Sequence, residues 1–196
     1  MVVVGAIVGI LASRGGGGGN AAAVAKDARA VGGTFQTVTA SRSALHIANF
    51  KPTVTYNSYP PTSGKHYYVP AVWGDYSQPV DPRQAVHNEE HGGIVIWYGP
   101  KISSQTRREI SAFYNESPNA MLVTPLPDST PGAKFPPHKP LGSRIALTAW
   151  NGTSSGGHGY VMILPRFDEK AMKAFRDAFR GKGPEPFPVS SLTPGS

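Results

Sequence analysis

The chain has 196 residues, of which 39% are hydrophobic and 16% charged, and this length suits one domain with a buried core. Its 23 glycines and 19 prolines indicate many turns and loops, which argues against a helical bundle. The formal net charge of +7 comes from lysines and arginines spread singly, without a nucleic-acid-binding signature, so we expect a solvated basic surface and no nucleic-acid partner. The absence of cysteine excludes disulfides, thiolate nucleophiles and iron–sulfur clusters.

The start of the chain, MVVVGAIVGILA at residues 1–12, is apolar throughout. As a helix it would span about 18 Å, whereas a bilayer core is about 30 Å thick, and it lacks the basic start of a signal peptide. It is interpreted as a partial membrane anchor whose true start lies upstream, as the apolar region of a secretory signal, or as a buried strand. Residues 13–30 are rich in glycine and alanine and are typical of a linker, which favours the first two interpretations. We therefore expect a protein anchored in the membrane and facing outside the cytoplasm.

Residues 31–187 are predicted to form one globular domain, followed by a flexible tail at 188–196. The predicted elements, in chain order, are a strand at 52–59, a short helix at 80–91, a strand at 93–99, a helix at 103–118, strands at 120–126, 144–150 and 159–165, and a helix at 167–183.

The order of these elements is strand–helix–strand and then strand–strand–helix, behind a loop-rich front section that contains histidines. A strand–helix–strand unit implies a parallel pair with a right-handed crossover, and the following hairpin adds an antiparallel pair. The sequence therefore predicts an α+β fold with a mixed sheet of four or five strands. Its topology is expected to be thioredoxin-like, with a ferredoxin-like sandwich as the alternative.

His87 and His91 are four residues apart, so they share one face of either a helix or a strand and can converge on one ion. A helix would place Glu90 beside His87, whereas a strand would place Glu89 there. Imidazoles with a carboxylate suit zinc, copper or iron. Residues 87–91 also fit the H-x-x-E-H pattern of inverted zinc metalloproteases, but those enzymes carry it on a long helix and Gly92 would end this one.

His66 follows the turn Pro-Pro-Thr-Ser-Gly at residues 60–64, in which the prolines are stiff and Gly64 permits a positive φ. Such a turn fixes the direction of the His66 side chain. His46 is a candidate fourth member of the group. His138 and His158 are interpreted as ordinary loop residues.

This block of motifs resembles the signature region of the bacterial family called domain of unknown function 3105. The resemblance extends over about residues 45–187, with one departure at Glu89, where the family more often has an apolar residue. It implies no established activity, although family members are often predicted to carry one N-terminal membrane helix. The matching residues are His46, Tyr56, Pro60–Gly64, His66, Trp73, Gly74, Tyr76, Val86, His87, Glu90, His91, Gly92, Tyr98 and Pro100.

Three functional hypotheses follow from the sequence and the resemblance. The first is a copper or zinc site formed by His46, His66, His87, Glu90 and His91; methionine is too scarce for a methionine-rich copper(I) carrier. The second is a structural or accessory subunit of a membrane complex, in which these residues form a hydrogen-bonded knot that fastens the front section to the sheet. The third is a metal-dependent hydrolase, and the sequence alone does not decide whether the protein is an enzyme.

Overall fold

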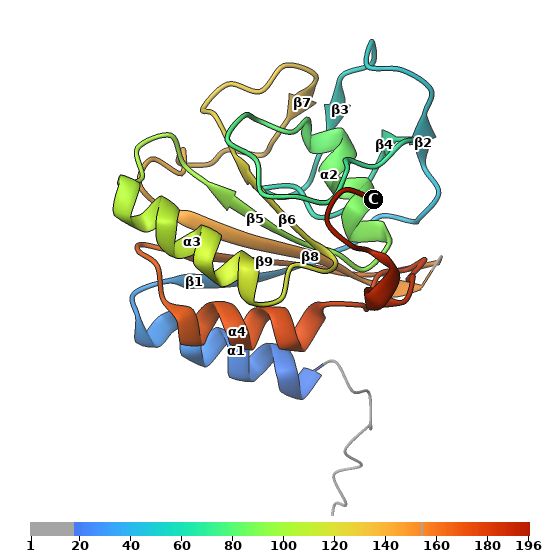
Figure 1. Cartoon of the computed structure of the whole chain (residues 1–196). Helices are drawn as coiled ribbons and strands as arrows, with labels where there is room; N and C mark the ends of the chain where they lie inside the picture. Colours follow the sequence, from blue (N-terminus) through green and yellow to red (C-terminus); the bar gives the residue numbers. More distant parts are fainter. Residues whose placement is uncertain (1–17, 154) are drawn as a thin grey trace, which may run out of the picture.

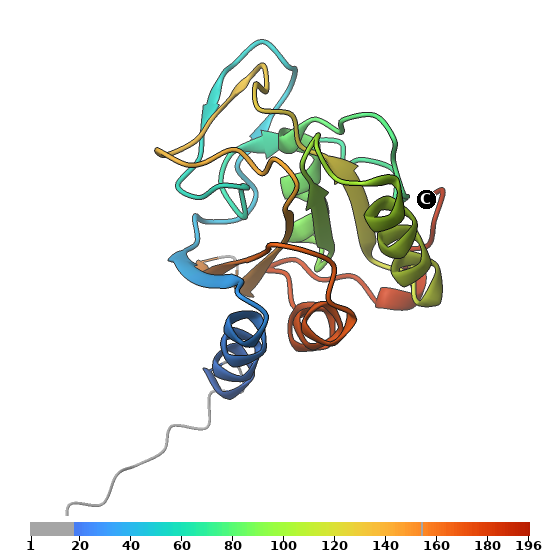
Figure 2. The same cartoon turned by 90° about the vertical axis from the view of Figure 1, so that its left-hand side faces the viewer.

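The computed structural model describes residues 18–153 and 155–196. A five-stranded sheet in the order β1-β9-β8-β5-β6 runs through the centre of the molecule, with α1, α3 and α4 on one face and α2 with the loop-rich front section on the other (Figures 1 and 2). The strands of this sheet are β1 (Thr34–Thr39), β5 (Ile94–Tyr98), β6 (Met121–Pro125), β8 (Ile145–Thr153) and β9 (Gly156–Leu164). The helices are α1 (Gly18–Ala30), α2 (Pro82–Glu90), α3 (Ser104–Glu116) and α4 (Glu169–Phe179), with a 3-10 turn η1 (Val189–Ser191).

The predicted α+β class with a mixed sheet is confirmed. Strands β5 and β6 are parallel and are joined through α3, whereas β8 and β9 form an antiparallel hairpin that leads into α4. Strand β5 lies between β6 and β8, and all five of its residues are buried. Ile94 and Ile96 belong to the core beneath the helices, while Val95 and Trp97 belong to the core on the opposite face. A strand covered on both faces explains its uninterrupted apolar sequence.

The caps of two helices lie where the sequence predicts them. The hydroxyl of Ser103 accepts a hydrogen bond from the amide of Thr106 at the start of α3, and the Asp168 carboxylate accepts one from the amide of Ala171 at the start of α4. Helix α4 then buries Met172, Phe175 and Phe179 against the sheet, as its apolar stripe predicts.

Helix α1 corrects the interpretation of residues 18–30 as part of a flexible linker. Val24 and Ala28 are one helical turn apart on the same face, and both are fully buried in the core that includes α4. Alanine has the highest helix propensity, so an alanine-rich segment that finds a partner surface folds readily. The prediction for residues 1–12 and the first part of the predicted linker, residues 13–17, lie outside the described residues. Within the described residues, no helix is both long enough and apolar enough to cross a membrane.

The end of the chain is also ordered, contrary to the flexible tail expected for residues 188–196. Leu192 is 9% exposed and packs into the second core, and its carbonyl accepts a hydrogen bond from the amide of Ala120. The amide of Trp73 donates to the carbonyl of Ser196. Backbone hydrogen bonds therefore hold this segment against the start of β6 and against the front section.

We call the region that carries strands β2, β3, β4 and β7 the front section. These very short strands form two parallel pairs, β2 (His46–Ile47) with β4 (His66–Tyr67) and β3 (Val54–Thr55) with β7 (Ala133–Lys134). The side chain of Arg83 in α2 forms hydrogen bonds with this front section. Its guanidinium donates to the carbonyls of Phe50 and Pro52, at 2.8 and 2.9 Å, and pairs with the carboxylate of Asp81. The section is thus fastened to the N-terminal end of α2.

Candidate metal centre

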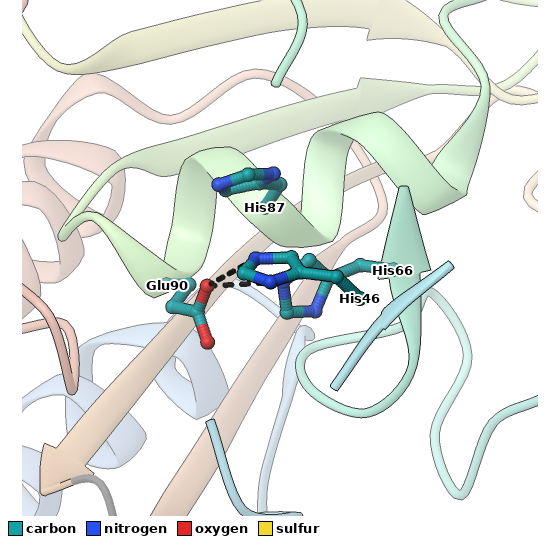
Figure 3. Close-up of side chains that lie close together, drawn as sticks. All are labelled: His46, His66, His87 and Glu90. Carbon is teal, nitrogen blue, oxygen red and sulfur yellow. Dashed lines mark ion pairs between the residues drawn. The ribbon is translucent and has the colours of Figure 1, made fainter. Parts of the chain in front are cut away.

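Helix α2 supplies one side of a histidine cluster. Asp81 caps it, Pro82 occupies its first turn, and Gly92, with a φ of 90°, follows its last turn. His87 and Glu90 are three residues apart and therefore lie on one face of the helix, as expected for a helical conformation (Figure 3). The short length and early end of α2 differ from the long helix that the metalloprotease pattern requires.

The paired strands β2 and β4 supply the other side. His46 and His66 are directly opposite each other in the parallel register, and their ring centroids are 4.6 Å apart. The stiff turn before His66 includes Gly64 with a φ of 120°, in agreement with the sequence analysis. Figure 3 shows both rings directed toward Glu90.

Four side chains meet at one centre, because His46, His66, His87 and Glu90 each offer a ligand atom within 4.8 Å of the other three. The Oε2 atom of Glu90 is 2.9 Å from Nε2 of His66 and 3.5 Å from Nε2 of His46. The side chains of His66 and Glu90 are fully buried, whereas that of His46 is 37% exposed. The centre therefore has a closed inner side and one ligand at the surface.

The ring orientation of three histidines is set by backbone carbonyls. The Nδ1–H groups of His66, His87 and His91 donate to the carbonyls of Gly64 (2.7 Å), Tyr67 (2.7 Å) and Glu185 (3.0 Å), respectively. A neutral imidazole carries one proton, so a proton held at Nδ1 leaves a lone pair on Nε2. Metal-binding histidines are commonly oriented by such a hydrogen bond from the second ring nitrogen.

The charges of the centre suit a cation. Burial is the main reason that the pKa of His87 is lowered, to about 4, which keeps this ring neutral and its lone pair available. Burial alone would raise the pKa of Glu90, but the adjacent His66 ring and the hydrogen bond from the Ala44 amide outweigh it and lower this pKa to about 2. A neutral imidazole and an ionised carboxylate are the protonation states that metal binding requires.

The sequence also matches a known family. Residues 48–190 match the family described as "Protein of unknown function (DUF3105)". The chain belongs to the DUF3105 family. The match confirms the resemblance seen in the motifs, and the matched part of the DUF3105 domain contains His66, His87, Glu90 and His91, while His46 lies two residues before it. No curated protein and no solved structure matched the chain, so the thioredoxin-like or ferredoxin-like topology of this DUF3105 domain stays a prediction.

His91, the fifth residue predicted for the site, lies beside the group of four. Its Nε2 is 2.9 Å from Nε2 of His87, and its ring packs against Phe187 with centroids 4.7 Å apart. The two other histidines lie elsewhere. His138 is in a loop, as predicted, and stacks on Tyr59, whereas His158, which was also interpreted as a loop residue, is exposed on strand β9.

Glu89, the departure from the family pattern, supplies no extra carboxylate to the DUF3105 centre. It is completely buried, and burial raises its pKa well above the usual value, which favours its neutral form. Sequence reasoning missed the carbonyl groups of Tyr67 and Glu185 that orient the rings. Every residue has a carbonyl, so the sequence contained no signal for them.

Proposed function

We propose that this domain binds one divalent transition metal ion, zinc or copper, through His46, His66, His87 and Glu90. The observation that carries the proposal is the fixed direction of the His66 and His87 rings. Backbone carbonyls hold their Nδ1 atoms, so their Nε2 atoms are directed to the centre that includes the carboxylate of Glu90. Three imidazole nitrogens and one carboxylate oxygen form a donor set that zinc and copper(II) accept. Calcium and magnesium prefer oxygen ligands, and the chain contains no cysteine for a thiolate site.

The distances between the ligand atoms support this proposal. With metal–ligand bonds of about 2.0–2.2 Å, neighbouring ligands are about 2.9 Å apart at a right angle and about 3.4 Å apart in a tetrahedron. The separations from Glu90 Oε2 are 2.9 Å to His66 and 3.5 Å to His46. A small inward movement of the exposed His46 side chain would complete the set.

Metal content of the purified full chain tests the proposal. After exposure to equimolar zinc or copper and removal of unbound ion, elemental analysis is expected to find about one ion per chain. The double substitution His87→Ala/His91→Ala should abolish uptake and His66→Ala should weaken it, while His158→Ala should bind as the wild type does. A wild-type protein without bound zinc or copper would contradict the proposal.

A second candidate function, a structural or accessory subunit, is favoured by the way the cluster connects the front section to α2. The amide of Ala44 donates to Oε1 of Glu90 at 2.6 Å, and His66 contacts the other oxygen. If the cluster is only such a hydrogen-bonded knot, the His87→Ala/His91→Ala variant should lose about 1–3 kcal/mol of stability per unsatisfied group, and neither form should contain metal.

We also propose that the domain is held at the membrane and faces outside the cytoplasm. The apolar residues 1–12 and the resemblance to a family with predicted membrane helices support this location. Helix α1, the first described element, lies on the face of the sheet opposite the histidine cluster (Figure 1). The cluster is therefore not covered by α1.

A further inference from the structure

On the basis of the proposed metal site, we infer that His87 and His91 form an outer metal position through which the ion enters and leaves the inner position formed by His46, His66, His87 and Glu90. His87 is the ligand shared by both positions. His91 therefore controls how fast the metal exchanges, and the inner ligands control how tightly it binds.

The contact between His87 and His91 requires a positive charge. Both Nδ1–H groups are donated to carbonyls, of Tyr67 and of Glu185, so the two Nε2 atoms present lone pairs to each other at 2.9 Å. Two lone pairs at this distance repel unless a proton or a metal ion lies between them. The separation equals that of two neighbouring ligands at a right angle around one ion, about 2.9 Å.

The two positions cannot be filled at the same time through His87. The Nε2 atom of an imidazole has one lone pair, and the Nδ1–H of His87 is held by the carbonyl of Tyr67. An ion bound between His87 and His91 must leave His91 to join His66 and Glu90. The outer position has only two protein ligands and the inner one has four, so the outer position binds more weakly.

The surroundings of His91 suit an outer metal position near the protein surface. His66 and Glu90 are fully buried, whereas His91 is half-buried at the end of α2, next to Phe187, which is 51% exposed. The C-terminal segment holds His91 from both sides: the carbonyl of Glu185 accepts its Nδ1–H, and the amide of Phe187 donates to its carbonyl. His91 is thus oriented in advance although it lies outside the group of four.

The exposed His46 offers a competing route, in which the ion binds the inner position directly from solvent. The two routes differ in what removal of His91 does. If His91 forms an intermediate binding position, its removal slows uptake and release by the same factor. The equilibrium affinity of the inner position stays unchanged, because the free and the fully bound states are the same on either route.

The experiment measures Zn²⁺ association and dissociation in the full chain by stopped flow with a competing chromophoric chelator. His91→Ala is expected to keep an affinity close to that of the wild type and to slow both rates by about tenfold. His91→Gln, which retains a donor for the Glu185 carbonyl, should behave in the same way. His66→Ala should lose affinity by about 100-fold, and His158→Ala should match the wild type in every measurement.

A second readout is the spectrum of bound Cu²⁺. Because the two positions share His87, the outer position should be seen when the inner one is disabled: His66→Ala with Cu²⁺ should show a weak species that is missing from His66→Ala/His91→Ala. Unchanged zinc rates in His91→Ala and His91→Gln would show direct entry past His46 and overturn the inference. An affinity loss as large as that of His66→Ala would overturn it as well, because His91 would then be an inner ligand. A wild type that binds neither metal would instead contradict the proposed function itself.

Discussion

At the scale of single residues, the histidines are oriented by three backbone carbonyl groups. Those of Gly64, Tyr67 and Glu185 hold the Nδ1 protons of His66, His87 and His91. In a purely structural knot these hydrogen bonds remain in place, and extra protons on the rings must bridge the contacts from His66 to Glu90 and from His87 to His91. One metal ion bridges the inner contacts with neutral rings, and this is the physical reason for preferring metal binding over the knot.

Replacement of Glu90 by Gln separates the charge of the centre from its shape. Gln is similar in size and can still accept the hydrogen bond from the Ala44 amide, but it brings no negative charge to the ion. We expect Glu90→Gln to fold and to bind Zn²⁺ about 10–100-fold more weakly, as measured by competition with a chelator. The neighbouring substitution Glu89→Gln is the control and should leave the zinc affinity unchanged. Equal losses in both variants would contradict the assignment of Glu90 as a ligand.

Glu89 provides a separate prediction about stability. Its carboxyl is fully buried and its pKa is raised, so the folded state holds the proton more strongly than the unfolded state does. The stability contributed by this group is fully present below the unfolded pKa of about 4.3 and declines as the pH rises toward the raised folded value. Glu89→Gln removes this dependence.

Urea unfolding of the metal-free protein at pH 5, 7 and 9 would measure the effect. The stability of the wild type relative to Glu89→Gln should fall as the pH rises. A constant difference between the two proteins at all three pH values would show that Glu89 does not titrate on unfolding.

At the scale of elements, the sequence predicted those whose pattern is periodic or continuous. The apolar run of β5 and the stripe of α4 are visible in the sequence because burial determines their composition. Helix α1 was missed because its glycines and alanines are also typical of linkers, and only the surface of α4 distinguishes the two. The pairing of β2 with β4 could not be predicted, since strands of two residues carry no periodicity. The convergence of His46 with His66 was therefore a hypothesis based on the motifs and the stiff turn.

The role of α1 as a structural element can be tested by truncating one buried side chain. Val24 is 1% exposed and lies in the core shared with α4. Val24→Ala should lower the free energy of unfolding by about 1–3 kcal/mol, because it removes buried methyl groups and leaves a cavity. Lys26→Ala, on the exposed side of the same helix, should change it by less than about 0.5 kcal/mol. Equal stability of the Val24→Ala variant and the wild type in urea unfolding would indicate that α1 detaches in solution.

At the scale of the whole molecule, the candidate centre joins segments that are distant in sequence. His46 and His66 come from the front section, His87 and Glu90 from α2, and the carbonyl that orients His91 from the C-terminal segment. All of them lie on one side of the sheet, while α1 and α4 cover the other (Figures 1 and 2). This division gives the molecule one face for the proposed metal chemistry and another that is stabilised by apolar packing.

The last prediction concerns where this molecule is held in the cell. Residues 1–12 carry no charge, and we expect the apolar segment to which they belong to retain the untruncated natural protein in the membrane fraction. The net charge of +7 could also attract the protein to anionic lipids. In 1 M salt, however, the Debye length is about 3 Å, so this electrostatic attraction is largely screened. Retention after a salt wash, with release by detergent, would therefore indicate insertion and not adsorption.

The matched control is the double substitution Ile7→Asp/Ile10→Asp, which places two charges in the apolar start and should shift the protein out of the membrane fraction. Protease added outside intact spheroplasts should digest the wild-type domain while a cytosolic marker survives, because the domain is expected to face outward. Recovery of the wild-type chain in the cytosolic fraction, or its full protection from the added protease, would contradict the proposed location.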